Sequence, residues 1–162
     1  MAQTDSYLII DEAPGESADK TYKDAIDVES WSWGETNTGS SAHGGGAGQG
    51  KVLPQDMSII KHVDKSSAVL FINCSTGTPF EKAVLVQRKA GEGQLAYLII
   101  TLTNVMVSSY QVSGSGDGGA IPTESIGLNF DSLEMVYKPQ DEKGGLGGEI
   151  KQTYSFKTNE KL

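Results

Sequence analysis

The sequence predicts a mainly β fold, in which antiparallel strands curve into a small barrel accompanied by one short helix and one long loop. Apolar residues recur mostly at every second position, which is the spacing of strands with one buried face. Twenty glycines among 162 residues suit many tight turns better than long helices. The apolar alternation also changes phase inside two of the strands, which indicates that these strands bend.

Each predicted strand follows from this alternation. The last one is the clearest, because Ile150, Tyr154 and Phe156 share one face while the other face is charged or hydroxylated, as in a half-exposed antiparallel strand. The predicted strands are Ser6–Asp11, Ala25–Trp33, Gln55–His62, Lys82–Lys89, Gln94–Val112, Glu124–Lys138 and Glu149–Lys157.

The two phase changes locate bends within the second and sixth of these strands. Apolar residues fall on even positions up to Val28 and on odd positions from Trp31. A β-bulge or bend near Glu29–Ser30 repairs this slip, and a second near Asp131–Ser132 repairs the same slip in the later strand. The strand Gln94–Val112 is too long to be flat, so we expect it to bend or to pair with two neighbours in turn.

One segment, Ser66–Cys74, is predicted to be helical. Asp64 is a suitable N-cap and Gly77 a suitable terminator. Because the helix is short, packing on the sheet must stabilise it. The expected apolar stripe consists of Ala68, Val69, Phe71 and Ile72.

The predicted loops contain one segment of unusual length. Gly34–Lys51 has 18 residues, and a loop of this length in a compact domain usually has a function of its own. The chain shows no interdomain linker and no internal repeat, so we expect residues 1–162 to form a single domain. The loops are Ala13–Lys23, Gly34–Lys51, Ser113–Thr123 and Pro139–Gly148.

The composition argues against several partners. With 13 basic and 21 acidic residues the net charge is −8, which leaves no basic surplus for nucleic acid or an anionic membrane. No stretch approaches the length of a membrane span, so no membrane insertion is expected. The single cysteine, Cys74, forms no intrachain disulfide, and the N-terminus lacks the pattern of a signal peptide.

Two glycine-rich motifs resemble nucleotide-binding signatures, but the residues that follow them do not fit a nucleotide-binding site. Gly45-(x4)-Gly50-Lys51 is followed by Val52 where a P-loop needs Ser or Thr, and a strand follows where it needs a helix. The segment Gly114–Gly119 matches the dinucleotide fingerprint letter by letter, but a proline and a strand come next. Both are interpreted as loops.

No catalytic or metal-binding constellation emerges from the remaining residues. The only histidines, His43 and His62, lack the cysteine partners or helical spacing of a zinc site. Cys74 lies in an apolar helix and is interpreted as a small core residue rather than a nucleophile. We therefore expect no enzyme, no cofactor and no metal.

The segment Trp31-Ser32-Trp33 gives the best candidate for a contact residue. At strand spacing the two tryptophans share one face, which we expect to be the core face. Ser32 then points the opposite way, which is the outside of a closed barrel, where a partner could touch it.

Several segments stand out together by their order and spacing: Trp31-Ser32-Trp33-Gly34, Gly44–Val52, Val63-Asp64-Lys65-Ser66, Arg88-Lys89-Ala90-Gly91, Tyr97–Leu102, Val107-Ser108-Ser109 and Leu128-Asn129-Phe130. In this order they resemble the haemolysin-coregulated protein (Hcp) family, which forms the inner tube of the bacterial type VI secretion system. The resemblance runs from the N-terminus to about Lys157.

The resemblance implies a compact antiparallel β-barrel of two packed sheets, with the helix on its side and a long extended loop. It also implies a homo-hexameric ring with a central pore, rings stacked into a tube, and sheath and spike proteins as partners. Some family members carry effector cargo in the pore, which makes Ser32 a pore and cargo candidate. The family's long loop reaches a neighbouring subunit or ring, and here its residues are Gly44, Gly45, Gly46, Gly48, Gly50 and Lys51.

The same resemblance implies synthesis in the cytoplasm and export through the tube without a signal peptide. Two alternatives remain at this point. One is a small β-barrel that binds an apolar ligand, although Trp31, Trp33, Phe130 and Tyr137 are large enough to fill its interior. The other is an enzyme acting through Gly45–Lys51.

Overall fold

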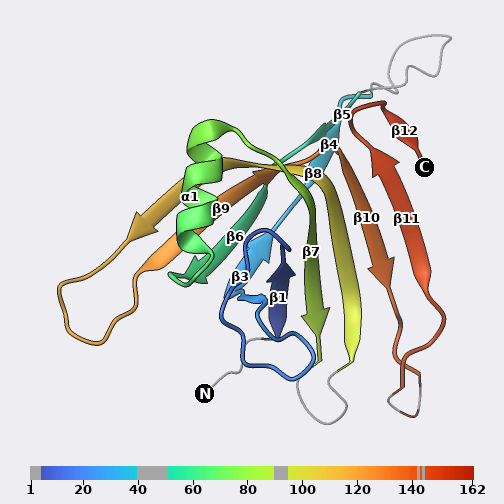
Figure 1. Cartoon of the computed structure of the whole chain (residues 1–162). Helices are drawn as coiled ribbons and strands as arrows, with labels where there is room; N and C mark the ends of the chain where they lie inside the picture. Colours follow the sequence, from blue (N-terminus) through green and yellow to red (C-terminus); the bar gives the residue numbers. More distant parts are fainter. Residues whose placement is uncertain (1–4, 40–50, 90–94, 142, 144) are drawn as a thin grey trace, which may run out of the picture.

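The computed structural model describes residues 5–39, 51–89, 95–141, 143 and 145–162. Two packed sheets share one long strand, and a helix lies beside them (Figure 1). The elements are β1 (Ser6–Ile9), β2 (Ile26–Asp27), β3 (Ser30–Ser32), β4 (Glu35–Asn37), β5 (Val52–Pro54), β6 (Met57–His62), α1 (Ser67–Thr76), β7 (Phe80–Arg88), β8 (Ala96–Ser113), β9 (Thr123–Asn129), β10 (Ser132–Tyr137), β11 (Ile150–Ser155) and β12 (Glu160–Lys161).

The first sheet has the order β12-β11-β10-β8-β7-β1-β2, and the second has the order β3-β6-β9-β8. All the strand pairs in them are antiparallel. Hydrogen bonds do not close the two sheets into a continuous barrel among the described residues. The mainly β prediction with one short helix is confirmed, with two packed sheets in place of a fully closed cylinder.

Strand β8 belongs to both sheets because it bends near its middle. Its first half pairs with β7 and β10, and its second half pairs with β9. Asn104 adopts a left-handed conformation with φ of 51°, and the register with β9 shifts between Val107 and Ser109. The expectation that this strand pairs with two neighbours in turn is therefore confirmed.

Both predicted phase changes coincide with a crossing from one sheet to the other. The amide of Val28 donates to Ser6 of the first sheet at 3.0 Å, while the next amide, that of Glu29, donates to Ile60 of the second sheet at 2.9 Å. The chain crosses back at Phe130–Asp131, between β9 and β10. Each crossing changes which side chains face inward, which is the slip seen in the sequence.

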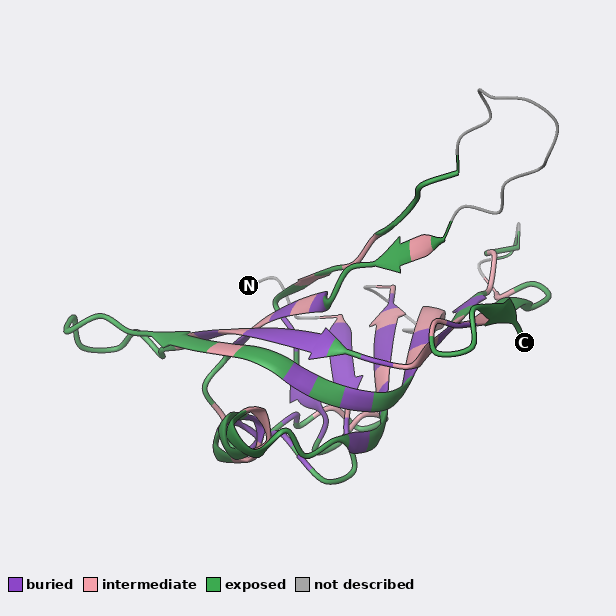
Figure 2. Ribbon diagram, turned by 90° about the horizontal axis from the view of Figure 1, so that it is seen from above, coloured by how far each residue is buried: buried purple, intermediate pink, exposed green. Residues whose placement is uncertain are grey.

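The core lies between the two sheets, where Figure 2 shows the buried segments of both layers facing each other. Alternate side chains of the long strands supply it, as their apolar periodicity predicts. Its most deeply buried members include Leu8, Ile26, Met57, Ile59, Leu70, Phe80, Leu85, Ile100, Leu102, Ile126 and Leu128.

The ends of α1 follow local capping chemistry. Its N-cap residue is Ser66 rather than the predicted Asp64. Asp64 lies two residues before this N-cap and stabilises the start of the helix. Its carboxylate accepts a hydrogen bond from the Ser66 amide at 2.8 Å, and its own amide donates to Ser67 Oγ at 2.9 Å. Gly77 ends the helix with φ of 70° and donates its amide to Asn73 at 2.9 Å, as predicted.

The predicted apolar stripe of α1 is right for Val69, which packs partly buried against the core, and wrong for Ala68, Phe71 and Ile72, which are exposed. Leu70 is the buried apolar residue, together with the hydroxyl of Ser67, whereas Phe71 and Ile72 are about half exposed. Because the residues from Ala68 to Ile72 are all apolar, their spacing does not select one face. The sheet contact selects it instead.

Three short strands were not predicted. The segment Gly34–Lys51, expected to be a loop, begins with β4, which pairs with β5 to form a separate two-stranded arm. Strand β12 pairs with β11 at the C-terminal edge of the first sheet. All three are largely exposed, so they lack the apolar alternation that reveals a buried strand.

Candidate functional site

Ser32 is exposed on β3, on the face opposite its two tryptophan neighbours. Trp31 and Trp33 pack partly buried against the core. The Trp31 indole donates to Gln87 Oε1 at 3.1 Å, and that of Trp33 donates to the Gln55 carbonyl at 2.9 Å. With both indoles held on the core side by packing and hydrogen bonds, Ser32 between them faces outward, as predicted.

An aromatic cluster anchors the end of β3 more firmly. The Trp33 ring lies 6.3 Å from both Phe130 and Phe156, and those two rings are 5.8 Å apart. Tyr154 adds a further edge contact with Phe156 at 5.2 Å. Such tilted and edge contacts are favourable, and here they join β3 to the turn before β10 and to the end of β11.

The row of residues that crosses the sheet through Ser32 is small and uncharged, and the exposed Asp56 carboxylate lies at its edge, where it accepts hydrogen bonds from Ser108 at 2.6 Å and Asn129 at 3.0 Å. Ser32 pairs in register with Ser58, Ser58 with Gly127, and Gly127 with Ser109. A Cβ at Gly127 would meet the hydroxyls of Ser109 and Ser108, so this position accepts only the smallest residue without rearrangement. A partner could therefore approach the backbone of this face closely and meet hydroxyl groups.

The second candidate element is the arm formed by β4 and β5, which extends away from the sheets (Figure 2). At its described end the Thr38 amide and hydroxyl both approach the Lys51 carbonyl, at 3.5 and 3.3 Å. The Lys51 side chain is exposed. The glycines of the predicted contact loop, Gly44, Gly45, Gly46, Gly48 and Gly50, lie outside the described residues.

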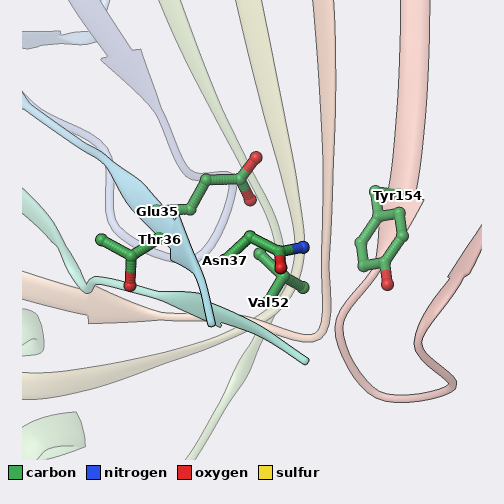
Figure 3. A pocket seen from close by; sticks show the side chains of 5 residues that line it. All are labelled: Glu35, Thr36, Asn37, Val52 and Tyr154. Atoms are coloured by element: carbon green, nitrogen blue, oxygen red, sulfur yellow. The ribbon is translucent and has the colours of Figure 1, made fainter. Parts of the chain in front are cut away.

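A hollow of about 390 Å³ separates this arm from β11 (Figure 3). Glu35, Thr36, Asn37 and Val52 line its arm side, and Tyr154 lines the β11 side. An adjoining hollow of about 310 Å³ is more apolar and lies over β10 and β11. Its lining residues are Trp33, Glu35, Leu133, Met135, Gln152, Thr153, Tyr154, Phe156 and Lys161.

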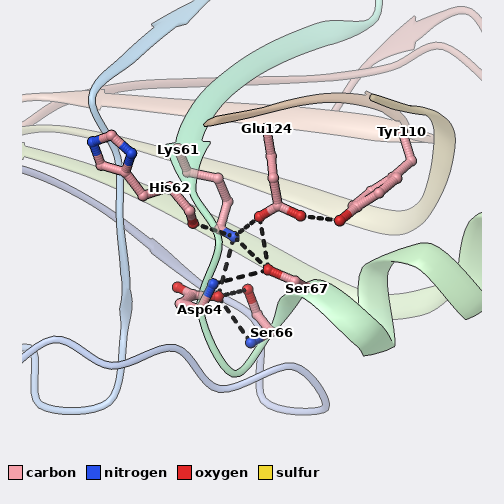
Figure 4. A network of polar contacts seen from close by, with 7 residues as sticks. All are labelled: Lys61, His62, Asp64, Ser66, Ser67, Tyr110 and Glu124. Carbon is pink, nitrogen blue, oxygen red and sulfur yellow. Dashed lines mark hydrogen bonds and ion pairs between the residues drawn. The ribbon is translucent and has the colours of Figure 1, made fainter. Parts of the chain in front are cut away.

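A buried polar network beneath α1 was not predicted (Figure 4). Lys61 of β6 forms an ion pair with Glu124 of β9, and both side chains are fully buried. Glu124 also accepts the hydroxyls of Tyr110 and of Ser67, the latter at 2.8 Å. Lys61 Nζ lies 3.1 Å from Asp64 Oδ1. Burial and the hydrogen bond to Glu124 raise the pKa of Tyr110 to about 12.

The sequence did carry a signal for this network. Lys61 occupies an inward-facing position of β6, in step with the buried Met57 and Ile59. Glu124 likewise occupies an inward-facing position of β9, in step with Ile126. A charged residue at an inward-facing position needs a partner. The network joins two strands of the second sheet to the start of the helix, so its role is to hold α1 in place.

A second buried cation anchors the N-terminal loop. The Arg88 guanidinium lies over the rings of Tyr7 and Tyr22, at 4.9 and 5.6 Å from their centroids, and donates to Asp19 Oδ1 at 2.6 Å. The hydrogen bond from Arg88 lowers the pKa of Asp19 to about 2. Arg88 and Tyr7 are buried while Asp19 and Tyr22 are partly exposed, so the cluster ties the N-terminal loop to β1 and β7.

The remaining sequence motifs do not form a chemical site among the described residues. The segment Gly114–Gly119 belongs to the turn between β8 and β9, with no helix after it. His62 pairs with Glu29, and His43 lies outside the described residues. No group of three or more potential metal ligands was found in the described part of the chain. Within the described residues there is no helix with both the length and the apolar character needed to cross a bilayer.

A sheet face crossed by small uncharged residues, backed by aromatic and ionic contacts, and a projecting arm define a structural subunit that works through its surfaces. A family model described as "Type VI secretion system effector, Hcp" matches residues 7–137. The protein hcp1 of Pseudomonas aeruginosa is 44% identical over 157 residues, which is 96% of each chain. The chain belongs to the Hcp family of type VI secretion tube proteins.

Solved structures agree with this assignment. One type six secretion system protein superposes with a TM-score of 0.91 at 31% identity, over 99% of this chain and 100% of that one. Hcp1 from Salmonella typhimurium superposes with a TM-score of 0.81 at 34% identity, over 98% of both chains. The protein is thus a secreted tube protein of a structural, non-enzymatic family, and the ligand-binding and enzyme alternatives are set aside.

Proposed function

We propose that this protein forms homo-hexameric rings that stack into the inner tube of a type VI apparatus, with Ser32 facing the pore. The observation that carries this proposal is the row of small, uncharged residues Ser32, Ser58, Gly127 and Ser109 across the second sheet, with the tryptophans packed behind it. A wall of this kind leaves room for cargo and offers hydroxyl groups along its length. Residues 1–162 act as one domain in this proposal.

The ring is tested by measuring the mass of the purified protein by light scattering after size exclusion, followed by negative-stain imaging. A hexamer mass with annular particles is the expected result. A protein that stays monomeric at high concentration would contradict the proposal.

The arm supports a role for residues 44–51 in stacking. It projects from the sheets, and its backbone is tied across β4 and β5 up to Lys51. Deleting Gly44–Gly50 should leave folded rings but shorten or abolish tubes. The control is deletion of Gly116–Gly118 in the turn between β8 and β9. If the variant that lacks Gly44–Gly50 forms tubes of normal length, residues 44–50 do not contribute to stacking.

Ser32 is the proposed cargo contact. Replacing it by tyrosine should fill the space above Ser58 and reduce the amount of effector that co-purifies, while rings persist. Ser75→Tyr, at an exposed serine of α1, is the matched control. Unchanged cargo retention by Ser32→Tyr would argue against pore contact at this position.

The wider partners follow from the family. The proposal includes contacts of the tube with sheath and spike proteins, carriage of effector cargo, and export through the apparatus after synthesis in the cytoplasm without a signal peptide. It includes no nucleic acid and no membrane insertion, since the net charge is −8.

A further inference from the structure

One carboxylate lies at the edge of the small-residue row that crosses the second sheet. Asp56 directly precedes β6, which lies beside β9 (Figure 1). The next residue, Met57, is fully buried and pairs in register with the equally buried Leu128. Because neighbouring residues of a strand point to opposite sides, Asp56 and Ser58 point away from the core. Asp56 is exposed, so it stands on the same surface as Ser32, the proposed cargo contact.

Two neighbouring strands hold this carboxylate in one orientation. Ser108 of β8 donates to Asp56 Oδ2 at 2.6 Å, and Asn129 of β9 donates to Asp56 Oδ1 at 3.0 Å. The register of β8 with β9 shifts at Ser108, and such a bulge re-aims a side chain. Gly127 leaves the necessary room, since a Cβ there would lie 2.9 Å from the Ser108 hydroxyl. The direction of the carboxylate is therefore set by the local structure.

The charge of Asp56 has no counter-charge in the described part of the chain. No lysine, arginine or histidine among those residues forms an ion pair with it. By contrast, Lys61 of β6 is fully buried and paired with Glu124, and the adjacent His62 pairs with a glutamate. The two groups that donate to Asp56 are neutral, and each carboxylate oxygen can accept a further hydrogen bond. Asp56 is thus a fixed, exposed anion with unused acceptor capacity.

We propose that Asp56 is a cation-selecting contact of the cargo surface, and that it binds an arginine side chain of the protein carried in the ring. This inference rests on the pore and cargo role proposed above and names the chemistry of the partner. A guanidinium fits because its planar fork donates to carboxylate oxygens in a fixed geometry. The small neighbours Ser58 and Gly127 leave a long side chain room to approach. A carboxylate that is already held in place loses little conformational freedom on binding.

Peptide binding to the assembled protein tests this charge preference. The probes are a fluorescently labelled peptide of alternating glycine and arginine, and two counterparts in which glutamate or serine replaces arginine. Fluorescence anisotropy should show the arginine peptide binding most tightly, and its binding should weaken as the salt concentration rises, because salt screens exposed charges. Every subunit supplies one Asp56, so a peptide with several arginines can engage several subunits at once.

Three variants separate Asp56 from the general negative charge of the protein. Asp56→Asn keeps the side-chain size and should weaken binding of the arginine peptide by about two- to fivefold for each arginine engaged, as expected for an exposed ion pair. Glu81→Gln removes the same charge from an exposed site on β7 of the first sheet and should leave binding unchanged. Asp56→Lys should bind the glutamate peptide more tightly than the wild type does, a gain that a misfolded protein cannot produce.

The results that overturn this inference differ from those that overturn the ring. The mass and circular dichroism spectrum of each variant establish that it forms folded rings. Equal binding of the arginine peptide by wild type and Asp56→Asn rings would remove Asp56 as a cargo contact and leave the ring and its pore standing. An equal loss in Asp56→Asn and Glu81→Gln would show that the peptide responds only to net charge. Wild-type protein that stays monomeric would overturn the proposed function, and this inference with it.

Discussion

Replacement of Lys61 by methionine is the sharpest test of what holds α1 to the second sheet. The substitution preserves most of the side-chain volume but removes the charge paired with Glu124, at a site where both side chains are 0% exposed. Glu124 would keep its hydrogen bonds from Ser67 and Tyr110, yet its charge would be buried without a counterion.

The expected cost follows from that unpaired charge. Removing one partner of a buried ion pair destabilises a protein by about 3–5 kcal/mol. For a chain of this size that loss lowers the Tm by roughly 6–20 °C. It is a large share of a total stability of about 5–15 kcal/mol. The assay is thermal and urea unfolding at one fixed protein concentration, because subunit association would add a concentration-dependent contribution.

The neighbouring Lys65 supplies the matched control. It is exposed, so Lys65→Met should change stability by no more than about 0.5 kcal/mol. The double variant Lys61→Met/Glu124→Gln should cost less than the sum of its single variants, by about 0.5–3 kcal/mol. If Lys61→Met costs no more than Lys65→Met, the buried pair does not anchor the helix and the reasoning fails.

Two further predictions concern the N-terminal loop. Arg88 holds the pKa of Asp19 near 2, below its ordinary value of 3.8, so the Asp19 carboxylate stabilises the fold above about pH 4 and this contribution disappears as the pH falls towards 2. Asp19→Asn should therefore make the free energy of unfolding depend less on pH between about 4 and 2. An unchanged pH dependence would contradict the prediction. A Cβ at Gly15 would lie 2.6 Å from the Ala25 carbonyl oxygen, so Gly15→Ala should lower the free energy of unfolding in urea by about 1–3 kcal/mol. A Cβ at Gly116 would meet open space, so Gly116→Ala should leave the stability unchanged. Equal effects of the two substitutions would refute the steric argument.

The alternation of apolar residues predicted most of the strands, because burial on one face imposes a period of two. It also located both sheet crossings, since a strand that changes sheets must change its inward side, as between Val28 and Trp31. It predicted the outward direction of Ser32 for the same reason. Each of these properties depends on residues close together in the chain, so a single sequence is enough to predict it.

Other properties depend on contacts between distant segments. The position of Lys61 in the alternation indicates that it is buried, but its partner Glu124 lies 63 residues away and is brought to it by the pairing of β6 with β9. The buried side of α1 was missed because its apolar residues surround the helix. The arm strands β4 and β5 escaped notice because they bury too little to show alternation.

Strand β6 shows how the interior and the proposed pore surface depend on each other. Its inward positions carry Met57, Ile59 and Lys61, and its outward Ser58 pairs with Ser32. The ion pair that fixes Lys61 therefore also fixes the strand that carries Ser58 at the centre of the proposed pore surface. A change at Lys61 should loosen that face without touching any residue on it, whereas a change at Ser32 should alter the face and leave the stability almost intact. Measuring both cargo retention and the free energy of unfolding in the two variants therefore distinguishes a residue that contacts cargo from a residue that only holds the contacting strand in place.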